Sequence, residues 1–187
     1  MNAFLVSTGI VAVAEIGDKT QLLSLVLAAR LRRPWAIVAG ILVATLLNHA
    51  LAGAVGAWIL SVLGPQVMRW VLGLSFIAMA AWALVPDKLD DGPPASSHLG
   101  AFATTAFAFF VAEMGDKTQV ATVLLAAKYH PLWEVVAGTT VGMLLANVPV
   151  VLLGSRFAQR LPLRAARVVA ALLFLVLAIW TAVRGLG

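Results

Sequence analysis

The stretch EIGDKT at residues 15–20 places two acids and a lysine inside a long apolar run, and EMGDKT does the same at residues 113–118. Of the 187 residues, 62% are hydrophobic and 11% are charged, whereas soluble domains carry roughly 25% charged residues. This composition predicts an all-α integral membrane protein. Each hexapeptide would then lie within a membrane-spanning helix, where an ionised side chain is costly.

An α-helix needs about 20 mostly apolar residues to cross a bilayer. Six stretches reach that length if the two hexapeptides are tolerated, and loops with Gly, Pro and charged residues separate them. The first stretch lacks a positively charged start and a clear cleavage site, which predicts a retained helix and not a signal peptide. The predicted transmembrane helices cover residues 3–29, 36–63, 67–85, 100–127, 133–154 and 165–183.

The two halves of the chain repeat each other at a constant offset of 98 residues. Three spans in each half would make the second half enter the membrane from the opposite side, which gives two inverted three-helix repeats, a common transporter architecture. We expect a first repeat at 1–85, an acidic cytoplasmic loop at 86–98 and a second repeat at 99–187. Outside the hexapeptides, the matched residues include Trp35 and Trp133, Gly40 and Gly138, Arg69 and Arg167, and Trp82 and Trp180.

Loop charges predict the orientation, because Lys and Arg are enriched in cytoplasmic loops. The loops on one side of the six spans hold most of these residues, which places both termini outside the cytoplasm. The net charge of +5 is therefore explained by membrane topology. We expect membrane lipid as a partner and no nucleic acid. The sequence has no Cys, which excludes disulfides and thiolate metal sites. The residues assigned to the cytoplasmic side are Arg30, Arg32, Arg33, Lys88, Arg156, Arg160, Arg164 and Arg167.

The buried charges can be partly paired within each hexapeptide. In a straight helix Glu15, Asp18 and Lys19 share one face, so that Lys19 could bridge Glu15 and Lys117 could bridge Glu113. A purely structural salt bridge would explain one acid per lysine but not the second acid. Four carboxylates and two lysines leave a formal charge of minus two. One divalent cation or two protons would neutralise it.

The residues around these acids indicate a site for a hard cation. Carboxylate, amide and hydroxyl oxygens suit Ca²⁺, Mg²⁺ and Mn²⁺. Gly17 and Gly115, between the acids, either permit a break in the helix that frees backbone carbonyls or allow close helix packing. The predicted metal ligands are Glu15, Asp18, Thr20, Gln21, Glu113, Asp116, Thr118 and Gln119, and the predicted supporting residues are Ser24, Thr122, Asn48, His49 and Asn147.

The doubled pattern E-x-G-D-[K/R]-[T/S] in a six-span chain with an acidic central loop resembles the Gdt-type cation exchanger family. This family includes Golgi manganese transporters and bacterial manganese exporters. The resemblance covers the whole chain and implies exchange of Mn²⁺ or Ca²⁺ against protons, without a bound cofactor, in a bacterial inner membrane. Its motif residues fall on Glu15, Gly17, Asp18, Lys19 and Thr20, and again on Glu113, Gly115, Asp116, Lys117 and Thr118.

The leading functional hypothesis is an exporter that works by alternating access, with Glu15 and Glu113 carrying protons and Lys19 and Lys117 compensating charge. A passive cation channel would use the same ligands. An intramembrane hydrolase with an aspartate pair is less favoured, because the lysine after each Asp favours the ionised carboxylate, whereas such a pair must share a proton. The sequence does not decide between Mn²⁺ and Ca²⁺, nor the oligomeric state.

Overall fold

The computed structural model describes residues 2–86, 100–154 and 162–185, and its regular elements there are all α-helices. The all-α prediction is therefore confirmed for these residues. Nearly all of the predicted acidic loop, and with it Lys88, lies outside them, as do Arg156 and Arg160. The helices are α1 (Ala3–Ala14), α2 (Lys19–Leu31), α3 (Pro34–Ala83), α4 (Ala101–Glu113), α5 (Lys117–Lys128), α6 (Leu132–Leu153) and α8 (Leu163–Arg184).

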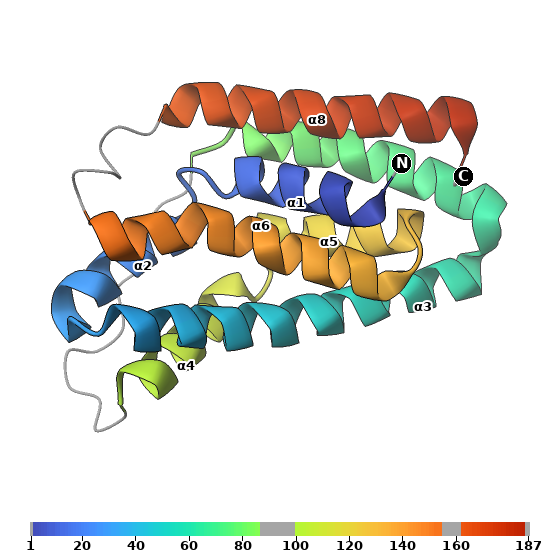
Figure 1. Ribbon diagram of the computed structural model, residues 1–187. Coiled ribbons are helices and arrows are strands. Elements are labelled where there is room, and N and C mark those ends of the chain that lie inside the picture. Colours follow the sequence, from blue (N-terminus) through green and yellow to red (C-terminus); the bar gives the residue numbers. More distant parts are fainter. Residues whose placement is uncertain (1, 87–99, 155–161, 186–187) are drawn as a thin grey trace.

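Three helices, α3, α6 and α8, are long and apolar enough to cross a membrane. Helix α3 has 50 residues, which at 1.5 Å per residue is about two and a half times the thickness of a bilayer core. It is interrupted at Gly64, whose φ of 70° and ψ of 165° are not helical, directly before Pro65. Figure 1 shows the chain turning back there. The predicted spans 36–63 and 67–85 therefore correspond to the two arms of α3.

Each hexapeptide interrupts a helix. The predicted span 3–29 consists of α1 and α2, and the predicted span 100–127 consists of α4 and α5. Gly17 and Gly115 have φ values of 83° and 74°, a conformation that L side chains rarely adopt. Of the two roles considered for these glycines, the helix break is confirmed. The expectation of a straight helix through residues 15–19 is wrong, because the chain changes direction at the glycine.

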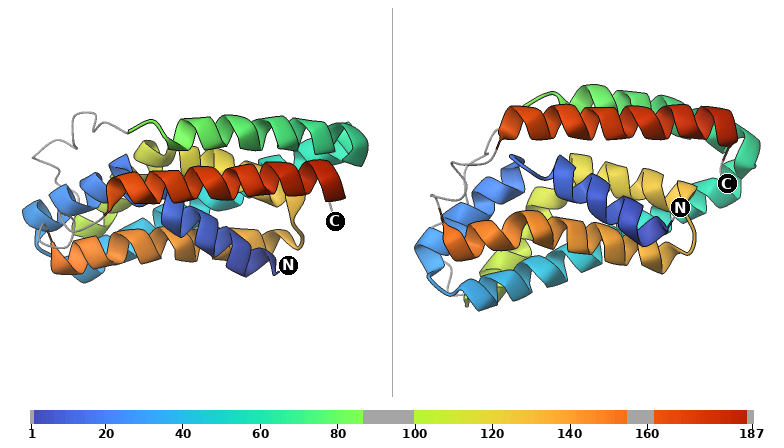
Figure 2. Two further views of the ribbon diagram at one scale, coloured as in Figure 1. Left: turned by 90° about the horizontal axis from the view of Figure 1, so that it is seen from above. Right: turned by 45° about the horizontal axis from the view of Figure 1, so that its top comes forward.

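The two halves of the chain are interleaved and do not form separate bundles. Helix α1 packs on α6, and both α4 and α5 pack on α3, so that each broken helix lies against the long helix of the other half. Figure 2 shows α8 and the second arm of α3 running side by side across one face of the bundle. The broken helices are thereby enclosed by elements from both halves.

The contacts between the halves occur in pairs related by the repeat offset. A Cβ atom on Gly40 would lie 2.8 Å from the carbonyl oxygen of Phe102 in α4. A Cβ atom on Gly138 would lie 2.5 Å from the carbonyl oxygen of Phe4 in α1. Residues 4 and 102 are separated by the same 98 positions as residues 40 and 138. Glycine lets the broken helices approach the long ones backbone to backbone, as small residues do in membrane helix pairs.

We expect Gly138→Ala to destabilise the protein by about 1–3 kcal/mol, because the added methyl group overpacks the contact with Phe4. Gly73→Ala is the matched control, since Gly73 is a buried helical glycine with nothing within 4 Å of its Cβ position. It should leave stability unchanged or raise it slightly. Thermal unfolding in detergent measures both. Equal unfolding temperatures for the two variants would contradict the close approach.

Candidate functional site

The two glutamates of the hexapeptides are fully buried. Glu15 caps the C-terminus of α1, and Glu113 is the last residue of α4. Both have no exposed surface. Within the described part of the chain, neither carboxyl oxygen of Glu15 has a hydrogen-bond partner, and neither does Oε1 of Glu113. Burying polar atoms without partners is unfavourable by about 1–3 kcal/mol each. These carboxyl groups are therefore poised to accept a proton or a cation.

The two aspartates begin the second helix of each break. Asp18 is the N-cap of α2, and Asp116 is the N-cap of α5, and each is 3% exposed. The charges of Asp18, Asp116 and Glu113 all act on the carboxyl group of Glu15. The structure thus brings all four predicted carboxylates into one region, although they come from residues almost 100 positions apart.

Lys19 joins the two hexapeptides directly. Its Nζ atom lies 3.1 Å from Oδ1 of Asp116, in the other half of the chain. The expected pairing of Lys19 with Glu15 is wrong, because the break at Gly17 places them on different helices. The lysine therefore compensates charge across the repeats. Figure 1 places α2 and α5, which carry the two residues, within the same bundle.

Hydrogen bonds made by the two glutamines stabilise the conformation of the helix breaks. Oε1 of Gln21 accepts a 2.9 Å hydrogen bond from the backbone N–H of Gly17, and Oε1 of Gln119 accepts one of 2.7 Å from Gly115. Nε2 of Gln21 donates to the carbonyl of Ala146. Nε2 of Gln119 donates to Oδ1 of Asn48, at the position equivalent to Ala146. Each glutamine thus connects its break to the opposite half.

The hydroxyl residues differ between the halves. Thr20 is fully buried, and within the described residues its hydroxyl has no hydrogen-bond partner. The hydroxyl of Thr118 donates to Oδ2 of Asp116 at 3.0 Å. Ser24 donates to Oδ1 of Asn147 at 2.7 Å, whereas Thr122 donates to the carbonyl of Thr118 at 2.8 Å. Ser24 and Asn147 are therefore hydrogen-bonded to each other across the halves, whereas Thr122, among the described residues, bonds within its own helix.

The two glutamates face different partners at equivalent positions. Nε2 of His49 lies 3.8 Å from Oε2 of Glu113, and both side chains are fully buried. The corresponding position next to Glu15 holds the amide of Asn147. His49 can carry a proton or a positive charge and Asn147 cannot. The two halves of the site are thus related in position but differ in proton chemistry.

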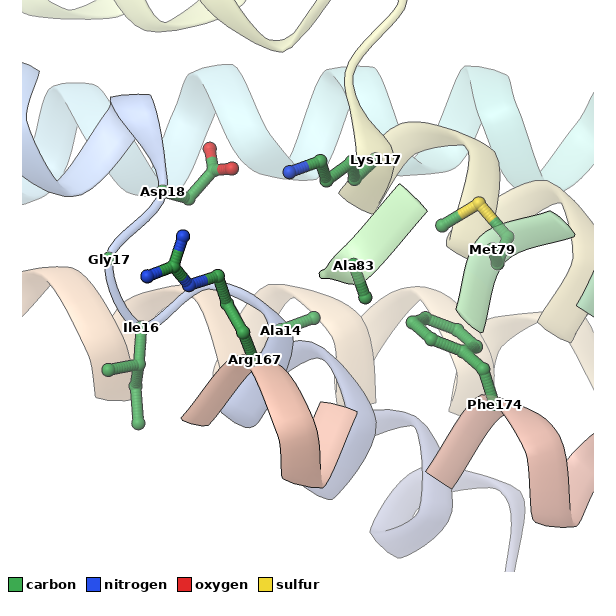
Figure 3. A pocket seen from close by; sticks show the side chains of 9 residues that line it. All are labelled: Ala14, Ile16, Gly17, Asp18, Met79, Ala83, Lys117, Arg167 and Phe174. Carbon is green, nitrogen blue, oxygen red and sulfur yellow. The ribbon is translucent and has the colours of Figure 1, made fainter. Parts of the chain in front are cut away.

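A pocket adjoins the first break. Nine residues line it, including Gly17 and Asp18 from the break, Lys117 from α5 and Arg167 from α8, and Figure 3 shows them. Nζ of Lys117 donates a 2.8 Å hydrogen bond to the carbonyl of Val85 at the end of α3. From the sequence, Arg167 is expected only to contribute to membrane topology. Its match with Arg69 at the repeat offset is the available signal of a further role.

The carboxylates as they stand do not form a closed metal cage. Among the residues described, no three His, Asp or Glu side chains are placed to hold one ion together. Lys19 instead supplies positive charge at Asp116. A divalent cation that binds Asp116 must displace this ammonium group, so that cation binding and lysine pairing are alternatives.

Long apolar helices around buried carboxyl groups at two helix breaks define the class of this molecule, because ionisable groups buried within a membrane mark ion pathways. It is an integral membrane ion transporter. The sequence model of the divalent cation/proton antiporter GDT1 matches residues 3–91 and 101–187. The chain belongs to this family, whose members are transporters and not enzymes.

Two curated relatives are similar along almost the whole chain. One is named "Putative manganese exporter", from Vibrio cholerae serotype O1, and is 53% identical over 183 residues, which cover 97% of this chain and 91% of the relative. The other is named "GDT1-like protein sll0615", from Synechocystis, and is 27% identical over 97% of this chain and 98% of the relative. No solved structure matches the chain.

We expect Lys19→Met to bind a divalent cation about tenfold more tightly, equivalent to about 1.4 kcal/mol, because the ion no longer competes with an ammonium group at Asp116. Release, and with it turnover, should slow. Arg164→Met is the control, since it removes the same charge from an exposed position. Titration of purified protein with Mn²⁺ measures the affinity. An unchanged affinity in Lys19→Met would show that the lysine does not compete with the cation.

Proposed function

We propose that this protein exports Mn²⁺ from the cytoplasm in exchange for protons, with Ca²⁺ as the alternative substrate. The observation that carries the proposal is the pair of fully buried glutamates, Glu15 and Glu113, at two helix breaks that a lysine–aspartate pair connects. Oxygen ligands of this kind suit hard divalent cations. The family is one of divalent cation/proton antiporters, and the relative from Vibrio cholerae carries a name that specifies manganese.

Exchange follows from the charge of the site. Removing a carboxylate from water favours its protonated form, and a nearby cation favours its ionised form. An arriving divalent cation should therefore expel protons from the glutamates, and its departure should allow them to return. Lys19 neutralises Asp116 while the site is empty. The empty site would then not have to change its exposure from one side of the membrane to the other with a net charge of minus two. Such a charge would be strongly unfavourable at the bilayer centre.

Alternating access fits the interleaved architecture. We propose six membrane-spanning segments in two inverted repeats, 1–85 and 99–187, with the arms of α3 and the pairs α1–α2 and α4–α5 each counting as spans. The paired contacts at Gly40 and Gly138 support this relation, since each half holds the other in the same way. Two nearly equivalent packings of the halves would open the site to either side in turn.

The proposed location is the bacterial inner membrane, with both termini outside the cytoplasm. Five of the eight arginines and lysines assigned to the cytoplasmic side lie in the described residues: Arg30, Arg32, Arg33, Arg164 and Arg167. They lie near the end of α2, the start of α3 and the start of α8. We call this the arginine-rich end. Figure 1 shows both chain termini at the opposite end of the bundle.

Flux measurements in proteoliposomes test the exchange. Purified protein would be reconstituted with a pH-sensitive dye inside, the membrane potential would be clamped, and Mn²⁺ would be added outside. We expect Mn²⁺ uptake to raise the proton concentration outside and lower it inside, and an imposed proton gradient to drive Mn²⁺ against its own gradient. Two protons per Mn²⁺ are expected if both glutamates titrate, and the cycle would then be electroneutral.

A panel of Ca²⁺, Mg²⁺ and Mn²⁺ in the same vesicles would rank the substrates. Protein-free vesicles are the control for leakage. Mn²⁺ movement that neither responds to the pH gradient nor changes the internal pH would contradict exchange and would establish the passive channel instead.

We expect Asp18→Asn and Asp116→Asn each to reduce Mn²⁺ transport by more than the 10- to 100-fold typical of supporting groups around a metal, because each removes an anionic ligand. Both variants should fold, since asparagine caps helix N-termini as well as aspartate does. Glu134→Gln is the matched control, because Glu134 is an acid at the start of α6, away from both breaks. Transport at the parent rate in either Asp variant would exclude that aspartate as an essential ligand.

A further inference from the structure

Arg167 occupies the pocket next to the first helix break. It lies in the first turns of α8, at the arginine-rich end. The apolar walls of the pocket are formed by Met79 and Ala83 from the second arm of α3 and by Phe174 from α8. In Figure 3 the guanidinium group of Arg167 and the ammonium group of Lys117 both point toward Asp18. A cation that reached Asp18 through this pocket would have to pass the guanidinium group.

The first turns of α8 also cover the break itself. A Cβ atom on Gly17 would lie 2.8 Å from Cδ2 of Leu163, one turn before Arg167. Among the described residues, the equivalent Gly115 has nothing within 4 Å of its Cβ position. The start of α8 therefore covers the first break, whereas the corresponding kink at Gly64 and Pro65 does not cover the second. The two halves thus differ in packing at these equivalent positions.

The arginine at the equivalent position of the first half is held differently. Arg69 donates through Nη2 to the carbonyl of Ala182 near the end of α8, and its guanidinium group stacks on Trp70 with 5.4 Å to the ring centroid. Among the described residues, Arg167 donates through Nε, at 3.3 Å, to the carbonyl of Leu163 in its own helix. Arg69 therefore clamps two helices together at the opposite end of the bundle, whereas the hydrogen bond of Arg167 stays within a single helix.

An equivalent clamp is available to Arg167. The residue equivalent to Ala182 is Leu84, the C-cap of α3. The last carbonyls of a helix lack intrahelical partners and favour nearby cations. The carbonyl of Val85, the next residue, already accepts a hydrogen bond from Lys117. A turn of the Arg167 side chain from the pocket to the carbonyl of Leu84 would reproduce the Arg69 clamp and clear the path to Asp18.

We propose that this pocket is the passage between Asp18 and the arginine-rich end, and that Arg167 is the gating residue that blocks it with a tethered positive charge. The proposal rests on the proposed function for the identity of the cation. The passage itself can be tested without transport. Because the guanidinium group acts on access and not as a ligand, Arg167 should control the rate at which solutes enter from one side only.

The absence of native cysteines makes accessibility measurable with a single introduced thiol. In Ala83→Cys, the thiol lines the pocket. The full-length protein would be labelled in its native membrane with a membrane-impermeant, positively charged methanethiosulfonate, in inside-out vesicles and in right-side-out spheroplasts. Three backgrounds would be compared: the parent Arg167, Arg167→Gln, and the control Arg164→Gln, which removes a charge from an exposed position in the first turn of the same helix.

We expect labelling from one face only. Labelling should be about tenfold faster in Arg167→Gln than in the parent, which corresponds to an entry barrier lower by about 1.4 kcal/mol. Arg164→Gln should label at the parent rate. Arg167→Lys, which keeps the charge, should label close to the parent rate. Arg167→Met, which also removes the charge, should label as fast as Arg167→Gln and serves as the second variant if Arg167→Gln does not fold. Equal labelling rates in all backgrounds, or labelling from both faces, would overturn the gate.

Mn²⁺ transport gives an independent readout. Arg167→Gln should lower the KM for Mn²⁺ at the labelled face and leave the KM at the other face unchanged. A structural defect would reduce the maximal rate from both faces and would count against gating. If the parent protein carries no Mn²⁺ at all, the proposed function fails, while the labelling result still decides whether Arg167 closes the pocket.

Discussion

The structure depends on the burial of carboxyl groups at two points where a helix is interrupted. In a continuous helix the backbone N–H and C=O groups are hydrogen-bonded within the helix, so that a ligand can contact only the side chains on one face. The left-handed glycines Gly17 and Gly115 end one helix and let an aspartate begin the next. Two acids are thereby placed around each break. The remaining helices exclude water from these acids and bring the two breaks together, and Lys19 supplies the charge that makes this arrangement tolerable.

The two halves of the chain are related by their sequence repeat and by their contacts. Contacts between the halves recur at equivalent positions, such as those of Gly40 with Phe102 and of Gly138 with Phe4. One pair of site residues deviates from this symmetry, since His49 stands where the other half has Asn147. The proposed alternating access would exchange the two environments between the halves.

Much of the fold could be predicted because hydrophobic length and the repeat offset are properties of the sequence itself. The described helices lie largely within the predicted apolar stretches, although the spans 3–29 and 100–127 are each interrupted and the spans 36–63 and 67–85 belong to one kinked helix. The hexapeptides contain the buried acids. The pairing of Lys19 could not be predicted, because a one-dimensional spacing rule assumes a straight helix and the break at Gly17 invalidates it. The bracing by Gln21 and Gln119 and the position of Arg167 in the pocket depend on contacts between the halves, which no local pattern specifies.

The central claim is that one site binds either a divalent cation or protons, and proton release on binding tests it most directly. Purified protein in weakly buffered solution would be titrated with Mn²⁺ while a pH indicator records released protons. The account predicts one to two protons per bound Mn²⁺, and a loss of this release in the double variant Glu15→Gln, Glu113→Gln. Mn²⁺ binding to the parent protein without proton release would contradict the account.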